Sequence, residues 1–205
     1  MIRAWYPSVI TDPETEIKGW EKKPPPVEQV RPSHCSRCHV ASRPPGGALR
    51  VVGHGVKPRQ LQGPLVAGER PRQVEVFVRR FLCRSCHRTM TVGPRQMRAR
   101  RRYSASALLL ALALWGLCGL SAGAIRKEVS PWQVPEDVTG WGSLARWAKQ
   151  GVAGRLWPLP GVPLGEAGAL REQVARLVYQ LVAPEPGEDP RHFAHRAFAV
   201  GAGRG

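Results

Sequence analysis

Two Cys-x-x-Cys pairs, Cys35–Cys38 and Cys83–Cys86, constrain the fold of this chain more than any other feature. Each such turn places two thiolates on one side of a metal ion, and two turns brought together by intervening strands close a tetrahedral site. The 44 residues between the pairs include Gly/Pro-rich segments that can form loops at small entropic cost. We therefore predict a four-cysteine zinc ribbon over residues 34–93. The ribbon would hold one structural Zn²⁺ through Cys35, Cys38, Cys83 and Cys86. With four sulfur ligands the ion has no open position for a catalytic water.

Other uses of these cysteines stay open, namely an iron–sulfur cluster or two disulfides. The first residues lack the apolar core of a signal peptide, so we expect a reducing, cytoplasmic compartment, which disfavours the disulfides. Cys118 lies alone in an apolar segment and is expected in a hydrophobic core. His39 and His87 follow the two pairs, and we expect surface positions for them, with support or replacement of a ligand as the alternative.

Charge is distributed unevenly along the chain. The net charge is +16, yet residues 31–127 hold 19 Lys and Arg against 2 Asp and Glu. A one-sign block of this size indicates a polyanionic partner, either nucleic acid or an anionic membrane surface, although a solvated arginine-rich surface is the alternative. The arginine fork pairs well with phosphate, so we predict double-stranded DNA as the partner. The first candidate contacts are Arg79, Arg80, Arg84, Arg88, Arg95, Arg98, Arg100, Arg101 and Arg102.

Local patterns divide the chain further. A proline-rich, irregular N-terminal arm is predicted over residues 1–33. Period-two alternation predicts a strand over 73–82 that runs into the second cysteine pair. A short strand is expected at 49–52, followed at 57–71 by a hairpin plus loop, and residues 94–103 form a basic linker.

The uncharged segment 105–125 is long enough to be a membrane span, but glycines and a Gly-Leu-Ser turn divide it. Ser104 and Ser121 can cap two helices, at 105–117 and 122–129, and a third helix is expected at 141–150. We therefore predict a helix-turn-helix-like trihelical unit over 104–150, with a membrane-tethered protein as the alternative. Residues 151–183 are expected to form a linker and an amphipathic helix, the helix running from 164 to 182. A disordered tail is expected at 184–205. The expected fold class is α+β, a small β zinc ribbon followed by a mostly α bundle.

The order of these features resembles the N-terminal DNA-binding region of bacterial insertion-sequence transposases, and stand-alone bacterial proteins that keep only that region. The resemblance covers residues 34–150 and rests on the cysteine pairs, Arg-Arg-Arg-Tyr-Ser at 100–104, Leu-Trp-Gly-Leu-Cys-Gly-Leu-Ser at 114–121 and Trp-Gly-Ser-Leu-Ala-Arg-Trp at 141–147. It implies that the third helix enters the DNA major groove, with contacts from Ser143, Arg146 and Lys149. If that helix does not read the sequence, our next candidate is the helix at 122–129, with Arg126 and Lys127.

Two features depart from that family's pattern. The loop at 130–140 is longer than usual, and His39 and His87 stand where glycine is common. A transposase nuclease also needs three carboxylates on a sheet-and-helix core to hold two magnesium ions. Here the acidic residues after Cys86 fall in predicted helices, loops and the tail, and no strand pattern follows residue 103. We therefore expect a non-catalytic DNA-binding protein, with a transposase or another protein as a further candidate partner. A ribbon used only for protein–protein contact is the alternative.

Overall fold

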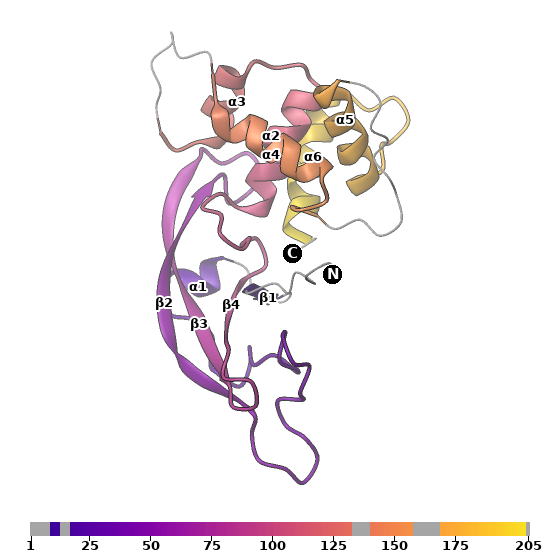
Figure 1. Ribbon diagram of the computed structural model, residues 1–205. Coiled ribbons are helices and arrows are strands. Elements are labelled where there is room, and N and C mark those ends of the chain that lie inside the picture. Colours follow the sequence, from indigo (N-terminus) through magenta and orange to yellow (C-terminus); the bar gives the residue numbers. More distant parts are fainter. Residues whose placement is uncertain (1–8, 13–16, 133–139, 158–168, 204–205) are drawn as a thin grey trace. The chain divides into compact units, whose positions relative to one another are not determined.

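The computed structural model describes residues 9–12, 17–132, 140–157 and 169–203 (Figure 1). The chain forms two compact units. The sheet unit comprises Met1–Leu61 and Val74–Arg102, and the helical unit comprises Gln62–Gln73 and Tyr103–Gly205. The fold is therefore mixed α+β, as expected.

A four-stranded sheet contains β1 (Val9–Asp12), β2 (Val51–Gly63), β3 (Arg72–Cys83) and β4 (Thr89–Pro94) in the spatial order β1-β4-β3-β2. β3 and β4 are antiparallel, with Arg79 opposite Val92, and β1 pairs in parallel with β4. The predicted strand at 73–82 is confirmed as β3. Its residues Val76 and Val78 are fully buried. In the strand order β2 pairs with β3 and lies at one edge of the sheet.

The expected irregular arm over residues 1–33 is wrong at residues 9–12 and 18–21, whereas residues 22–33 contain no helix or strand. β1 and the short helix α1 (Lys18–Glu21) form in the first two segments, because Ile17 and Trp20 bury their side chains and β1 finds a partner strand. The following prolines are held by Arg79, whose guanidinium donates to the carbonyl oxygens of Pro25 at 2.6 Å and Pro24 at 3.4 Å. Backbone lacking regular structure is thus anchored by a side chain from β3.

β2 is longer than the sequence indicated. Strand structure was expected only at 49–52, with a hairpin and loop from residue 57, whereas β2 continues to Gly63. The glycines and Pro58 are tolerated because an edge strand has backbone positions that need no partner. From Gly53 to Pro58 every residue of β2 is exposed.

Five helices form the helical unit: α2 (Ala105–Gly116), α3 (Ala122–Val129), α4 (Gly142–Val152), α5 (Leu170–Leu181) and α6 (Pro190–Gly203). α2 lies at its centre, with ten residues buried, and packs against all four others. The predicted caps are confirmed, since the Ser104 and Ser121 hydroxyls accept from the N–H groups of Ala107 at 3.0 Å and Ala124 at 3.2 Å. The uncharged segment is therefore a bundle core, and no helix in the described ranges is long and apolar enough to span a membrane.

The tail from residue 184 was expected to be disordered, and that prediction is wrong. α6 buries Phe193, Ala194, Ala197 and Phe198, and its contacts with α2 are the most extensive between helices of this unit. Gly201 permits close approach, because a methyl group there would lie 2.8 Å from the Cα atom of Ser106.

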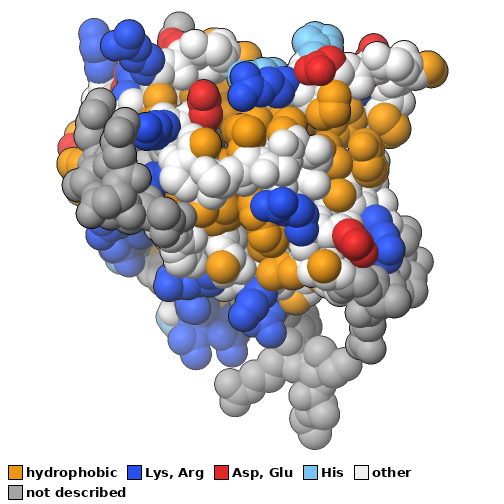
Figure 2. All heavy atoms as spheres, turned by 90° about the horizontal axis from the view of Figure 1, so that it is seen from above, with side chains coloured by type: hydrophobic (Ala, Val, Ile, Leu, Met, Phe, Trp, Pro, Cys, Tyr) orange, Lys and Arg blue, Asp and Glu red, His pale blue; other side chains and the backbone are white. Residues whose placement is uncertain are grey.

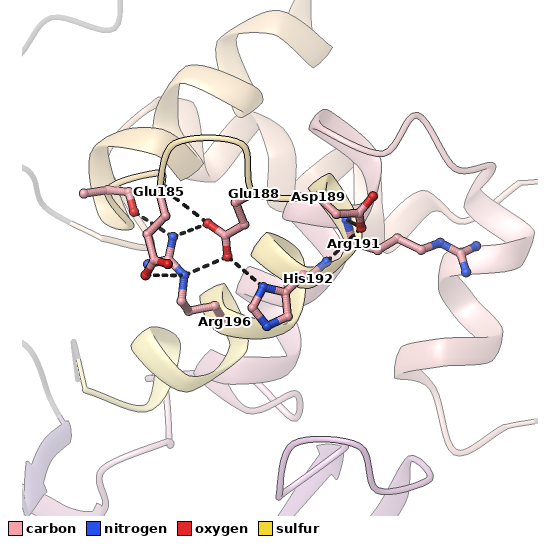
Figure 3. Close-up of polar contacts among 7 residues, drawn as sticks. Glu185, Glu188, Asp189, Arg191, His192 and Arg196 are labelled. Carbon is pink, nitrogen blue, oxygen red and sulfur yellow. Dashed lines mark hydrogen bonds and ion pairs between the residues drawn. The ribbon is translucent and has the colours of Figure 1, made fainter.

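Polar contacts order the start of α6 (Figure 3). Arg196 forms an ion pair with Glu188 and donates to the carbonyl oxygen of Ala183 at 2.8 Å. The Asp189 carboxylate accepts from the N–H groups of Arg191 at 2.9 Å and His192 at 3.2 Å, which caps the first turn. These bonds offset the Pro/Gly-rich composition that suggested disorder.

The helix-turn-helix arrangement remains a prediction. α3 packs against α2, whereas α4 packs against α2 and α5. Within the described residues α3 and α4 make no extensive contact with each other. Most of the predicted loop, 133–139, lies outside the described residues, as do residues 164–168 of the expected C-terminal helix, whose described part begins at Leu170. An aromatic cluster anchors the start of α4, where the ring centroids of Trp141 and Tyr103 each lie 4.8 Å from that of Trp147.

Candidate metal centre and cationic surfaces

The two cysteine pairs form turns with the same backbone hydrogen bonds. The N–H of Cys35 donates to the carbonyl oxygen of Val40 at 2.9 Å, and Cys83 makes the equivalent bond to Arg88 at 3.0 Å. The carbonyl oxygens of the same two cysteines accept from the N–H groups of His39 at 3.0 Å and His87 at 2.9 Å. We call these two turns, residues 35–40 and 83–88, the knuckles.

The four sulfur atoms of the knuckles converge. The Sγ atoms of Cys35 and Cys86 are 3.7 Å apart, as are those of Cys38 and Cys83, and all four lie within 4.8 Å of one another. Zinc–sulfur bonds of about 2.3 Å define a tetrahedron with sulfur–sulfur edges of about 3.8 Å, whereas a disulfide needs about 2.0 Å. The cysteines are free thiols in the structure, so this cluster could hold a metal ion.

Burial differs within each pair. Cys35 and Cys83 are fully buried, Cys86 is half-buried and Cys38 is exposed. Burial acts to raise the pKa of Cys83, yet the N–H groups of Cys86 and Ser85 lower it to about 7. Burial and neighbouring thiols instead raise the pKa of Cys86 to about 12. Four thiolates this close repel one another, so the fully ionised set requires a cation, and sulfur donors suit a soft one.

Contacts from the sheet position both knuckles. Cys83 is the last residue of β3, so the strand delivers it directly to the cluster. The N–H of Arg84 donates to the carbonyl oxygen of Arg50 at 2.8 Å, just before β2 begins. The first knuckle contacts β4, where the N–H of Ser36 approaches the Met90 sulfur at 3.2 Å. The metal centre is thus built on the sheet unit alone.

The predicted DNA contacts in the sheet unit separate into two groups. Arg84 and Arg88 are exposed on the second knuckle, and Arg100 and Arg102 are exposed before the helical unit, with Arg80, Arg95 and Arg101 half-buried. Arg79 is instead bonded to the Pro24 and Pro25 carbonyls. Arg98 is half-buried, and this burial lowers the pKa of its guanidinium to about 10. The structure thus shows Arg79 engaged in hydrogen bonds within the sheet unit, and the proposed phosphate contacts of these arginines remain predictions.

Candidate contacts in the helical unit lie on α3 and α4. Arg146 and Lys149 are exposed on α4, opposite the buried residues Leu144 and Ala148, while Ser143 is half-buried. On α3 Lys127 is exposed, whereas Arg126 is half-buried with its Nε atom shielded from solvent.

A cationic groove in the sheet unit was missed by sequence reasoning. It is open, with a volume of about 440 Å³, and it brings Lys57 and Arg59 of β2 together with three of the predicted arginines. The signal was the Lys-x-Arg spacing, because alternate residues of a strand share one face. The hairpin and loop predicted at 57–71 do not place Lys57 and Arg59 on one face of a continuous strand, so the sequence pattern did not indicate the groove. The lining residues are Lys57, Pro58, Arg59, Gln60, Glu75, Arg100, Arg101 and Arg102.

Charge is concentrated in the sheet unit. Its residues include 19 Lys and Arg against 6 Asp and Glu, whereas the helical unit has 12 against 9. The excess positive charge therefore belongs to the unit that holds the cysteine cluster. The face of the molecule in Figure 2 carries hydrophobic patches among charged side chains of both signs.

Comparison with protein-family models, curated proteins and solved structures finds no match to this chain.

Proposed function

We propose that this protein is a non-catalytic, zinc-dependent protein that binds double-stranded DNA, an accessory or regulatory module related to transposase DNA-binding regions. One observation carries the proposal: the unit built around the four-cysteine cluster also holds most of the chain's excess positive charge. Metal binding would order that unit and so hold its cations in place.

Zinc is the metal best suited to the cluster. Four sulfur donors with near-tetrahedral spacing match a structural zinc site, in which every coordination position is filled by protein. Metal binding at such a site is coupled to folding of the segment that supplies the ligands. The bound ion would hold both knuckles together, and through them β3 and the segment before β2.

DNA is the partner favoured by the charges. Exposed arginines on the sheet unit include Arg37, Arg50, Arg84 and Arg88 around the knuckles. Arginine donates two parallel hydrogen bonds to a phosphate, and neutralising phosphates releases counterions from the duplex. Affinity should therefore depend steeply on salt.

The test is binding of a duplex to the zinc-loaded protein across a series of salt concentrations. If about six cations contact phosphates, a plot of log affinity against log salt should have a slope of about −5. Protein treated with a strong chelator serves as the control and should bind much more weakly. A flat salt response, or the absence of binding at about 50 mM salt, would overturn the proposal.

A further inference from the structure

We infer that the cationic groove between β2 and residues 100–102 binds the phosphate backbone of one strand of a nucleic acid. This inference rests on the proposed function and assigns a particular site to it. Two of the residues that it requires, Lys57 and Arg59, lie outside the arginine-rich segment at 79–102.

The composition of the groove carries the inference. Five of its eight lining residues are cationic and one, Glu75, is acidic. Among the described residues, no ion pair or side-chain hydrogen bond engages Lys57, Arg59, Arg100 or Arg102. Elsewhere in the same unit, Arg31 and Arg43 both pair with Glu28. Unpaired cations that share a groove repel one another, and a bound polyanion would relieve that repulsion.

The size of the groove limits its occupant. A volume of about 440 Å³ is that of a small-molecule site. It can take a short stretch of sugar–phosphate backbone but not a whole duplex. A duplex would therefore place one strand in the groove, with the other strand outside.

The edge of β2 argues against a peptide strand as the occupant. Strand addition would use the backbone N–H and C=O groups of an edge, yet Pro58 has no N–H to donate. The recognition elements that remain are side-chain cations. Arginine forks fit phosphate oxygens, and the chain's charge excess in this unit favours a polymer of phosphates over an isolated anion.

Arg100 offers a way to separate folding from binding. Its backbone φ is 58°, in the left-handed region that glycine adopts more easily than arginine. Arg100→Gly would therefore remove the side chain from the groove and relax the backbone at the same time. The melting temperature should not fall, whereas DNA binding should weaken.

The main experiment compares two double variants that remove equal charge from the sheet unit. Lys57→Ala with Arg59→Ala alters the groove, whereas Lys22→Ala with Lys23→Ala alters exposed lysines outside it. Binding of a 16-base-pair duplex is measured by fluorescence anisotropy across a salt series. The groove variant should bind about tenfold more weakly, with a slope shallower by about two units. The matched control should stay within about twofold of wild type, because long-range electrostatics alone are screened.

Glu75→Gln supplies a change of opposite sign. Removing the one carboxylate of the groove should tighten duplex binding, since it lies where phosphates would pass. Weaker binding by this variant would contradict a phosphate site.

The outcomes separate the two proposals. If the wild-type protein does not bind duplex at low salt, the proposed function fails and the groove assignment fails with it. If wild type binds with a steep salt slope but the groove variant and Arg100→Gly match the lysine control, only the groove assignment fails. Poly-glutamate that competes as well as DNA at equal charge would identify an acidic protein as the partner and overturn the phosphate assignment. If the groove double variant does not fold, DNA binding by Arg100→Gly alone tests the groove assignment.

Discussion

His39 and His87 adopt the same left-handed backbone conformation, with φ of 57° and 56°, each directly after the second cysteine of its knuckle. A side chain with a Cβ atom is strained in this region, and glycine is not. Here two histidines accept the strain instead.

His87→Gly should therefore stabilise the metal-loaded protein, by up to about 1 kcal/mol. Thermal unfolding in excess zinc is the measurement. His34→Gly is the matched control, because His34 is exposed but does not have a positive φ. That control should be neutral or destabilising. Equal effects of the two substitutions would mean that backbone strain at the knuckle is not the cause.

Loss of one sulfur ligand should unfold the sheet unit. In Cys83→Ser the remaining ligands cannot close the site, and metal binding is coupled to folding. Helix content should change little, because α2 to α6 all belong to the helical unit. The measurements are zinc per chain, limited proteolysis and circular dichroism. Cys118→Ser, outside the cluster, should keep one zinc per chain. A Cys83→Ser protein that still holds one zinc would contradict the site.

Close packing between α6 and α2 should make Gly201→Ala destabilising. The added methyl would lie 2.8 Å from Ser106 Cα and 3.1 Å from the Ala105 carbonyl oxygen, and neither backbone atom can move freely. The expected loss is about 1–3 kcal/mol in urea unfolding. Gly142→Ala is the control, since a methyl there meets nothing within 4 Å. Its stability should be unchanged or rise by up to about 1 kcal/mol.

Stability should fall in acid as Glu188 becomes protonated. Its hydrogen bonds with Arg196 lower the pKa of this carboxyl from 4.5 to about 2. A lowered folded-state pKa means that the contribution is complete above 4.5 and is lost as the pH falls towards 2. The free-energy difference between wild type and Glu188→Gln should therefore shrink across that window. Glu172→Gln, on an exposed part of α5, should show no such dependence. A constant difference for Glu188→Gln would contradict the ion pair's role.

If α4 reads DNA sequence, Arg146→Ala should cost more affinity on a preferred site than on random DNA. An arginine fork matches guanine O6 and N7, which discriminates by about 1–3 kcal/mol. The measurement is selection of bound sequences with wild type, Arg146→Ala and the exposed control Arg155→Ala. Recovery of one motif with equal information content by all three would exclude α4 as the reader. Lys127 on α3 would then be the next candidate.

Several features could be predicted because they depend on local sequence. The spacing of the cysteines was enough to anticipate that four sulfurs would meet, since each pair forms its own turn. Period-two alternation indicated β3, and Ser104 and Ser121 marked the first residues of α2 and α3 through hydrogen bonds within one turn.

Other features were decided only by tertiary structure, because they depend on contacts between distant segments. α6 follows a Pro/Gly-rich stretch and was missed, although Arg196, Glu188 and the packing of Gly201 on Ser106 stabilise it once α2 is in place. Arg79 carries the same charge as Arg102, yet Arg79 is half-buried and bonded to the carbonyl oxygens of Pro24 and Pro25, while Arg102 stays exposed. The groove likewise joins residues 57–60 to 100–102. Sequence determined which residues could bind a metal or a phosphate, and folding decided which of them remain exposed and lie together.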